Sequence, residues 1–193
     1  MIDPVAVVDI DGVLADFSLA FTRRLADRGL IPSAIPCSAQ QTWNFRDSLP
    51  VTRNDERAVW AEIDASHTFW AELPVVATEE DRIALHRRAR RAGLVYMTGR
   101  LDRGNRTFAQ TKHWLIGHGF PLGELVMQGD KARGVATLGG TVIGIVDDKP
   151  DALETLVAAG EPVTALTRPY NEHVLVPRVA AVAEWAEGCG RTE

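Results

Sequence analysis

Near the N-terminus the chain reads Val5-Ala6-Val7-Val8-Asp9-Ile10-Asp11-Gly12-Val13-Leu14. Its first four residues are apolar and mostly β-branched, which is typical of a strand buried on both faces inside a parallel sheet. Because side chains alternate along a strand, Asp9 and Asp11 point to the same side, and Gly12 lets the chain turn where a ligand could come close. Two like charges at one strand end repel each other, so we expect them to hold a cation or to divide the roles of acid and nucleophile.

The composition is that of a protein with one substantial hydrophobic core. The chain has 193 residues, 46% of them hydrophobic, so we expect one compact domain with an insertion. The formal charge is −5 and the basic residues are scattered apart from a run at 87–91, which argues against nucleic acid or an anionic membrane surface as a partner.

Several absences point to the same compartment. No apolar run approaches the roughly 20 residues of a membrane span, and acidic residues interrupt the N-terminus too early for a secretory signal. Cys37 and Cys189 lie far apart and lack the paired spacing of a zinc site. We therefore predict a soluble, cytoplasmic protein.

From residue 76 onward, strand and helix patterns alternate. Apolar strand patterns at 94–98, 124–127, 141–146 and 163–166 are separated by helical patterns, and a final helix is expected over 174–185. This alternation predicts an α/β fold, a Rossmann-like open parallel sheet with helices on both faces.

A segment of different character follows the first strand and its helix. Residues 30–51 contain three prolines and a polar stretch with aromatic residues, and a helix is expected near 54–65. We therefore assign residues 1–29 and 76–193 to a catalytic core and residues 30–75 to a small helical cap inserted into it.

Polar residues stand where the predicted strands end. Ligands of open parallel sheets bind outside the carboxyl ends of the strands, and the residues at those positions are Asp9, Asp11, Thr98, Lys131, Asp147 and Asp148. Taken singly, each has an ordinary explanation, such as a helix cap or a solvated charge. Together they bring carboxylates, a hydroxyl and an ammonium to one edge, which indicates a shared site.

These residues resemble known motifs. Four segments are similar, in order, to those of the haloacid dehalogenase-like phosphohydrolases: Asp9-Ile10-Asp11-Gly12-Val13, Met97-Thr98-Gly99-Arg100, Lys131 and Val146-Asp147-Asp148. Within that superfamily, Asp9 to Phe17, Lys112 to Leu115, Asp130-Lys131 and Asp147 to Asp151 are similar to the 5′(3′)-deoxyribonucleotidases. Two features depart from that closer pattern: Thr98-Gly99 stands where those enzymes usually have Thr-Ser or Thr-Cys, and a glycine-rich insert occupies 134–140.

The resemblance implies a Mg²⁺-dependent phosphomonoester hydrolase that acts through an aspartyl-phosphate. A Mg²⁺ ion held by oxygen ligands would screen the repulsion between a phosphate ester and a carboxylate nucleophile. We expect Asp9 to be nucleophile and metal ligand, and Asp11 to be the acid and base and, by its backbone carbonyl, a metal ligand. Asp147 and Asp148 would complete the metal site.

The remaining motif residues would serve the phosphoryl group. Lys131 would offset the negative charge, and Thr98, by its hydroxyl and the backbone amides that follow it, would hold phosphoryl oxygens. The cap would exclude water over a small phosphate ester, which suits a nucleoside monophosphate. The residues expected to contact substrate are Phe17, Trp43, Phe45, Trp70, Gly99 and Arg100, although large aromatic side chains also serve ordinary packing.

Three other functions stay open on the sequence alone. A polynucleotide 3′-phosphatase of the repair type shares the Thr98-Gly99-Arg100 and Asp147-Asp148 combination, but it would need a basic groove that follows a strand. A phosphatase for another small metabolite would fit the same motifs. A non-catalytic nucleotide-binding protein is the third alternative. It is disfavoured because every motif residue is chemically competent for catalysis. The sequence also leaves open whether the chain forms a homodimer.

Overall fold

One parallel sheet carries the polar strand ends. The computed structural model describes residues 4–102 and 105–189, and within them six strands pair in the order β3-β2-β1-β4-β5-β6. The strands are β1 (Pro4–Asp9), β2 (Gly93–Thr98), β3 (Glu124–Met127), β4 (Thr141–Asp147), β5 (Val163–Leu166) and β6 (Arg178–Val179). Every pairing is parallel, so all carboxyl ends lie along one edge.

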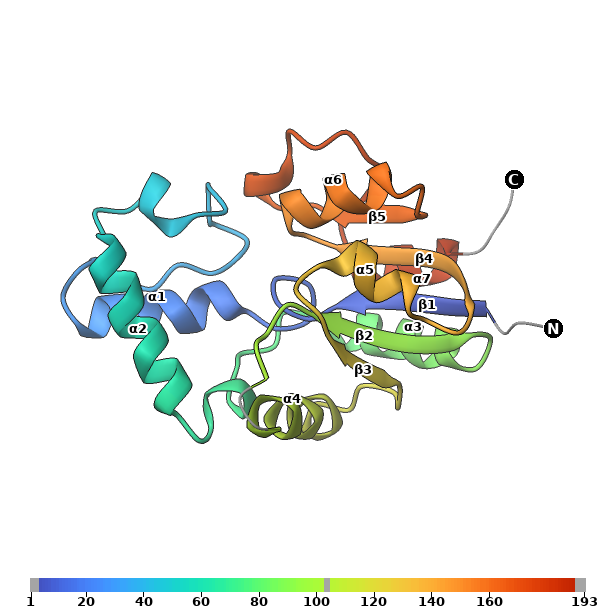
Figure 1. The fold of residues 1–193 in the computed structure, drawn as a ribbon, viewed down its shortest axis with the longest axis horizontal. Coiled ribbons are helices and arrows are strands. Elements are labelled where there is room, and N and C mark those ends of the chain that lie inside the picture. The colour runs from blue at the N-terminus through green and yellow to red at the C-terminus, as the bar shows by residue number, and fades with distance from the viewer. Residues whose placement is uncertain (1–3, 103–104, 190–193) are drawn as a thin grey trace.

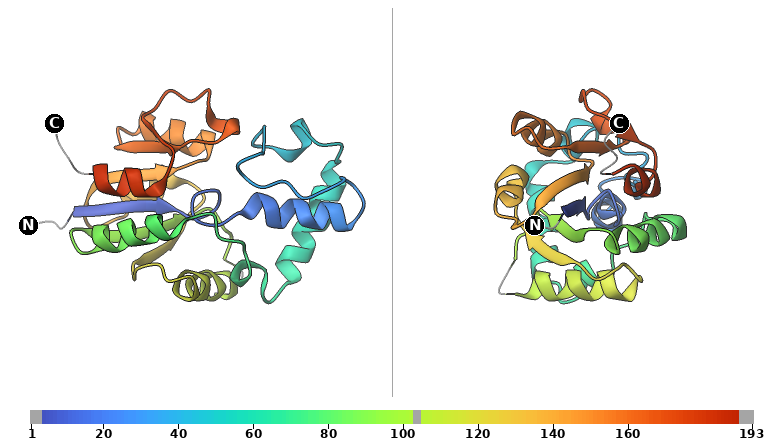
Figure 2. Two further views of the ribbon diagram at one scale, coloured as in Figure 1. Left: turned by 180° about the vertical axis from the view of Figure 1, so that it is seen from behind. Right: turned by 90° about the vertical axis from the view of Figure 1, so that its right-hand side faces the viewer.

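Helices cover both faces of this sheet (Figures 1 and 2). On one face lie α5 (Lys131–Ala136) and α6 (Pro150–Ala158), which contact each other. On the other face lie α3 (Glu79–Ala89) and α7 (Val182–Gly188), which also pack together, while α4 (Arg106–Gly117) lies beside the edge strand β3. The expected Rossmann-like α/β fold is therefore confirmed.

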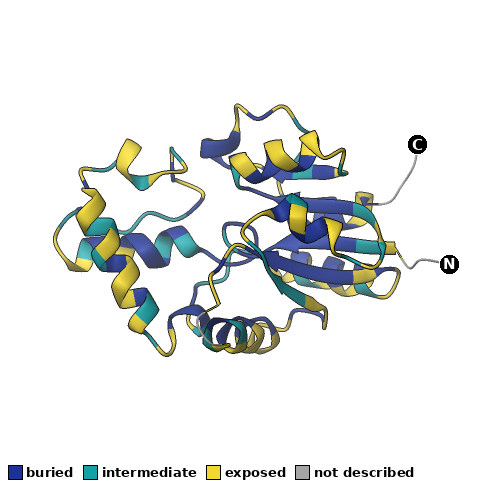
Figure 3. Ribbon diagram, viewed as in Figure 1, coloured by how far each residue is buried: buried dark blue, intermediate teal, exposed yellow. Residues whose placement is uncertain are grey.

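Strand β1 shows why its sequence is an unbroken apolar run. Ala6 and Val8 point into the core that contains α3 and α7, whereas Val7 points into the core that contains α5 and α6. All three are essentially inaccessible to solvent. A central strand with helices on both sides has no polar face, so the usual alternation of apolar and polar residues disappears. Figure 3 shows the same burial along the sheet.

The insertion after β1 forms a separate layer of helices (Figure 1). It contains α1 (Phe17–Asp27), the 3₁₀ turn η1 (Phe45–Asp47), α2 (Arg53–Ala65) and the 3₁₀ turn η2 (Phe69–Ala71). Helix α2 begins with a capping box in which the side chains and backbone amides of Thr52 and Asp55 bond reciprocally. Val59 and Ile63 are its buried residues, and Figure 3 shows that much of this helix is exposed.

Two short segments join the insertion to the core and run antiparallel to each other. The amide of Asp16 donates to the carbonyl of Pro74 at 2.8 Å, and the amide of Val76 donates to Leu14 at 2.8 Å. Helix α1 lies beyond these segments, and it contacts α2. We therefore propose that the cap begins near Asp16 rather than at residue 30, so that α1 belongs to the cap.

The C-terminal part differs from the helix expected over 174–185. Residues Arg178 and Val179 form strand β6 on the edge of the sheet, and α7 begins only at Val182. The amide of Ala165 donates to Pro177, and the amide of Thr167 donates to Val179. Pro177 cannot supply the amide that a helix interior needs, so pairing with β5 replaces the weak helical pattern. None of the helices in the described ranges is both long and apolar enough to cross a membrane.

Candidate active site

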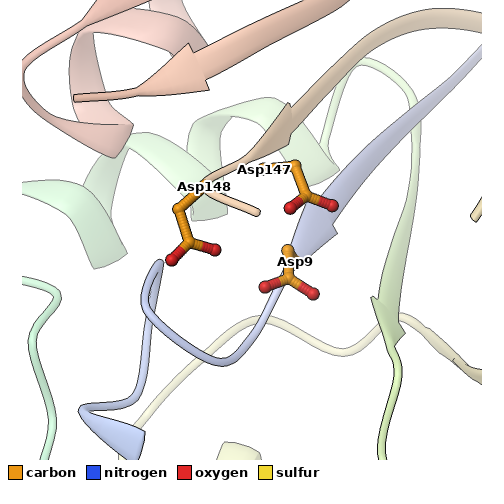
Figure 4. A group of neighbouring side chains, drawn as sticks. All are labelled: Asp9, Asp147 and Asp148. Atoms are coloured by element: carbon orange, nitrogen blue, oxygen red, sulfur yellow. The ribbon is translucent and has the colours of Figure 1, made fainter. Parts of the chain in front are cut away.

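The register of the sheet brings the acidic residues together. Val8 pairs with Val146, so Asp9 and Asp147 follow on adjacent strands. Asp148 comes next in the chain, and single carboxylate oxygens of the three residues lie within 4.8 Å of one another. Figure 4 shows the three side chains gathered where β1 and β4 end. All three residues are buried.

Lys131 lies among these carboxylates. Its ammonium donates to Asp9 Oδ1, to Asp147 Oδ2 at 2.8 Å and to the backbone carbonyl of Met97 at 3.0 Å. Burial alone would lower the pKa of Lys131, but attraction to Asp147 and Asp9 outweighs burial and raises it. The side chain therefore stays cationic and neutralises part of the buried negative charge.

Burial acts in the opposite sense on the carboxyls. It raises the pKa of Asp9 well above its usual range, with opposition from Lys131 and support from repulsion by Asp147, Asp148 and Asp11. Burial and repulsion by Asp147 also raise the pKa of Asp148 to about 7. The positive charge of Lys131 and Arg168 is thus too little for the group, and the carboxyls of Asp9 and Asp148 hold their protons unusually tightly when no metal ion is bound.

Asp148 is fixed by its surroundings on one side only. The hydroxyl of Tyr170 donates to Asp148 Oδ2, and the side-chain amide of Asn171 donates to the Asp148 backbone carbonyl at 2.8 Å. Asp148 Oδ1 is buried and has no hydrogen-bond partner among the described residues. A buried carboxylate oxygen without a donor is costly, so Oδ1 is a natural ligand for a cation.

The turn after β1 is shaped around that carboxylate. Gly12 has φ +83°, and a Cβ built on it would lie 1.9 Å from Asp148 Oδ2. Its carbonyl accepts two bonds from the guanidinium of Arg168, at 3.0 and 2.6 Å. Only glycine fits there, for reasons of both backbone conformation and space.

The donor set fits magnesium. Mg²⁺ prefers hard oxygen ligands and takes them from carboxylates. Asp9, Asp147 and Asp148 supply clustered carboxylates, and the unpaired Oδ1 of Asp148 is a further sign that the residues suit a cation. Among the described residues, the side chain of Asp11 is not part of this cluster. A contact between its backbone carbonyl and the metal stays a prediction.

The side chain of Asp11 is instead held by the second motif. Arg100 donates to Asp11 Oδ2 from Nε at 2.8 Å and to Oδ1 from Nη2 at 2.7 Å. The hydroxyl of Thr98 donates to Asp11 Oδ2 at 3.2 Å, and Thr98 itself is fully buried. A contact between Thr98 and a phosphoryl oxygen therefore stays a prediction.

A cavity of about 270 Å³ opens above these residues, between core and cap. Most of the residues predicted for the site line it: Asp9, Asp11, Phe17, Trp43, Trp70, Gly99, Arg100, Lys131 and Asp147. Phe45 is outside this lining and stacks on Phe21, with ring centroids 4.8 Å apart. The position of Phe45 thus favours packing within the cap over contact with a ligand.

Aromatic rings form the cap side of the cavity. Phe17 contacts Trp60 and Trp70 in stacked arrangements, with ring centroids 5.5 and 5.8 Å apart, and it also contacts Phe21 and Phe69. The more accessible rings belong to Trp43 and Trp60, which are 36% and 42% exposed. A planar ligand would find its free aromatic surface on these two tryptophans.

Several residues at the site were not predicted, among them Trp60, Gly129, Lys149 and Tyr170. The first three line the cavity, and Tyr170 bonds Asp148. Lys149 directly follows the acidic pair, so a cation beside two carboxylates was a usable signal. Trp60 is an exposed aromatic residue on α2, which was a weaker signal. Tyr170 lies in the 3₁₀ turn η3 (Pro169–Asn171) after β5, and no pattern in the sequence points to it.

Solved structures with similar folds define the class. The chain superposes with a TM-score of 0.57 on a haloacid dehalogenase-superfamily hydrolase of subfamily IA from Geobacter sulfurreducens, at 18% identity over 96% of this chain and 95% of that one. A phosphonoacetaldehyde hydrolase-like protein from Oleispira antarctica gives a TM-score of 0.59 at 14% identity, over 100% of this chain and 96% of that chain. The fold is therefore that of the haloacid dehalogenase-like hydrolases.

The sequence identifies the family within that class. Residues 3–189 match the family described as 5′ nucleotidase, deoxy (pyrimidine), cytosolic type C protein, so the chain belongs to this nucleotidase family. A Bacillus cereus protein named as a candidate nucleotidase is 35% identical over 83 residues. That match covers 40% of this chain and 41% of the relative's length.

The raised pKa of Asp148 predicts how stability depends on pH without metal. A carboxyl with a higher pKa in the folded chain than in the unfolded chain binds its proton more tightly when folded, so stability rises as pH falls through about 7 and is lost as pH rises. In EDTA, wild type should gain on the order of 1 to 2 kcal/mol relative to Asp148→Asn between about pH 8 and about pH 5.5. Denaturant unfolding of both proteins at each pH measures this, and parallel pH profiles would contradict it.

Proposed function

We propose that this protein is a phosphatase that hydrolyses nucleoside monophosphates, with Mg²⁺, through an aspartyl-phosphate on Asp9. The observation that carries the proposal is the position of Asp9, at the floor of a cavity that has carboxylates and Lys131 below and tryptophans above. Membership of the nucleotidase family supports the same substrate class.

The residues divide the reaction between them. Asp9 attacks phosphorus, the ester bond breaks, and Asp11 gives a proton to the leaving oxygen; Asp11 then takes a proton from the water that hydrolyses the aspartyl-phosphate. Asp9, Asp147, Asp148 and the backbone carbonyl of Asp11 would hold Mg²⁺, and the ion would supply positive charge that screens the approach of two anions. Lys131 holds Asp9 in place and offsets charge that would otherwise repel the substrate.

The cap is proposed to select the substrate. Trp43 and Trp60 offer accessible rings over the cavity, and Phe17, which also lines it, stacks on Trp60 and on Trp70. Lys149 lies 5.5 Å from the Trp43 ring centre and adds a cation to the cavity wall. Gly99 and Arg100 bound the side nearest the core. A base would stack on the tryptophans while its phosphate reaches Asp9.

We also propose a cytoplasmic location for the enzyme. Cys37 and Cys189 are both buried and unpaired, which suits a reducing compartment.

A substrate panel tests the proposed activity. Deoxyribonucleoside and ribonucleoside 5′-monophosphates, a 3′-phosphate, a sugar phosphate and a 3′-phosphorylated oligonucleotide would be compared by phosphate release with Mg²⁺ and with excess EDTA. We expect the nucleoside monophosphates to have the highest kcat/KM, and EDTA to abolish turnover. Preference for the oligonucleotide would support the repair phosphatase instead, and preference for the sugar phosphate would support a phosphatase of another metabolite.

The nucleophile can be tested separately. Asp9→Asn should lower kcat by at least about 10³-fold and prevent a phosphoenzyme from forming, because an amide is a poor nucleophile toward phosphorus. Acid quenching with a ³²P-labelled substrate measures the phosphoenzyme. Asp27→Asn, at an exposed end of α1, is the matched control and should behave as wild type. Phosphoenzyme at wild-type levels in Asp9→Asn would show that another group attacks.

The cap tryptophans give a prediction about specificity. Base stacking is worth about 1 to 3 kcal/mol, so Trp60→Ala should lower kcat/KM for a nucleoside monophosphate by roughly 5-fold to over 100-fold. A small aryl phosphate should be affected less, because it has no base to stack. Phe17→Ala should act in the same direction, since its ring supports Trp60. Trp60→Phe keeps an aromatic face and should retain most of the selectivity, and an equal loss for both substrates would contradict base stacking.

A further inference from the structure

Arg100 is a buried cation whose contacts are directed at one acid. Its side chain is 1% exposed, whereas that of Asp11 is 22% exposed. Nε and Nη2 engage the two oxygens of Asp11, and Nη1 donates to the Thr111 hydroxyl at 2.8 Å. This bidentate contact uses two nitrogens of the planar guanidinium and holds the Asp11 carboxylate in one orientation.

The guanidinium of Arg100 is itself held in place by Thr111 of the core and by Trp70, in the segment that returns from the cap. It lies over the Trp70 ring, 4.6 Å from the ring centre, and its partner Thr111 lies on α4. Helix α4 also fixes the segment that returns from the cap, because Gln110 accepts from the Trp70 amide at 2.9 Å and Trp114 donates to the Leu73 carbonyl at 2.7 Å. These contacts within the protein hold Arg100 in place without a contribution from a substrate.

The bidentate contact with Arg100 leaves the Asp11 carboxylate accessible from the cavity. Asp11 lines the cavity and is the more exposed partner of the pair. Three donors, two from Arg100 and one from Thr98, restrict rotation of its carboxylate. A group that moves protons must have its oxygen within hydrogen-bond reach of the reacting atom, so orientation limits the rate directly.

We propose that Arg100 is a positioning residue that acts through Asp11, rather than a ligand of the substrate phosphate. The inference rests on the proposed function, in which Asp11 transfers the proton. In the second step, the water oxygen forms a bond to phosphorus and the bond from phosphorus to Asp9 breaks, with its electron pair returning to the Asp9 carboxylate. The water proton passes to an oxygen of Asp11, which Arg100 holds toward the cavity.

A double-mutant cycle tests this assignment. Arg100→Lys keeps the charge but cannot grip both oxygens, and Arg100→Met removes the charge. With an activated aryl phosphate, each should lower kcat by about tenfold to a hundredfold while KM changes little. In an Asp11→Asn background, the same substitutions should lower kcat no further, because the group that Arg100 orients is already lost.

A second measurement applies if Asp11→Asn is too slow for the cycle. Poor orientation of Asp11 slows the water step, so Arg100→Lys should raise the fraction of enzyme trapped as phosphoenzyme by acid quenching. Arg28→Lys is the matched control, because Arg28 pairs with Glu62 on the exposed surface of the cap. That variant should keep wild-type kcat, KM and phosphoenzyme fraction, and circular dichroism would check that each variant is folded.

The other outcomes overturn the assignment in distinct ways. A large rise in KM in both backgrounds would make Arg100 a substrate ligand. Equal losses of kcat with and without the Asp11 carboxylate, or an unchanged phosphoenzyme fraction in Arg100→Lys, would leave it only a structural role. If wild-type enzyme released no phosphate from the aryl phosphate or the nucleotides, the proposed function itself would fail, whatever the variants did.

Discussion

The site depends on the repulsion between carboxylates that the sheet forces together. Asp9 and Asp147 are adjacent because β1 and β4 pair in parallel, and Asp148 follows immediately. Removal from water makes their charges more costly, and Lys131 among them, with Arg168 beside Asp148, offsets only part of that cost. The buried and unpaired oxygen of Asp148 shows where positive charge is still lacking. Fold and chemistry are linked here, since the same strand register that closes the core creates the demand for a cation.

The motif residues could be predicted because their position follows from local rules. Buried parallel strands appear in a sequence as apolar runs, and their carboxyl ends lie at one edge of the sheet. The convergence of Asp9, Lys131 and Asp147 could therefore be predicted without knowing how the loops fold. The cap helix near 54–65 was also expected, because α2 has a clear start and a helical pattern. Its extent was harder to define, since the amphipathic pattern of α1 does not reveal whether that helix packs on the sheet or on α2.

What the sequence could not supply were contacts made by segments folding back from a distance. Tyr170 reaches Asp148 from a turn after β5, and the guanidinium of Arg100 bonds both carboxylate oxygens of Asp11. Neither the Tyr170–Asp148 contact nor the Arg100–Asp11 contact has a periodic signature, because each depends on where a loop lies and not on which element the residue belongs to. Strand β6 was not predicted for another reason. Its two residues are too few for an alternating pattern to appear, and its pairing with β5 is what defines it as a strand.

Gly12 has a consequence for how relatives of this chain can be compared. The volume that a side chain would occupy there is already filled by the carboxylate of Asp148, and the backbone adopts a conformation that other residues rarely take. Any replacement would have to displace the very oxygen that Tyr170 holds. A relative with another residue at this turn would need both a different backbone conformation and a displaced Asp148 carboxylate. The identity of this single position therefore reports whether the same turn and the same acidic pocket can both be present.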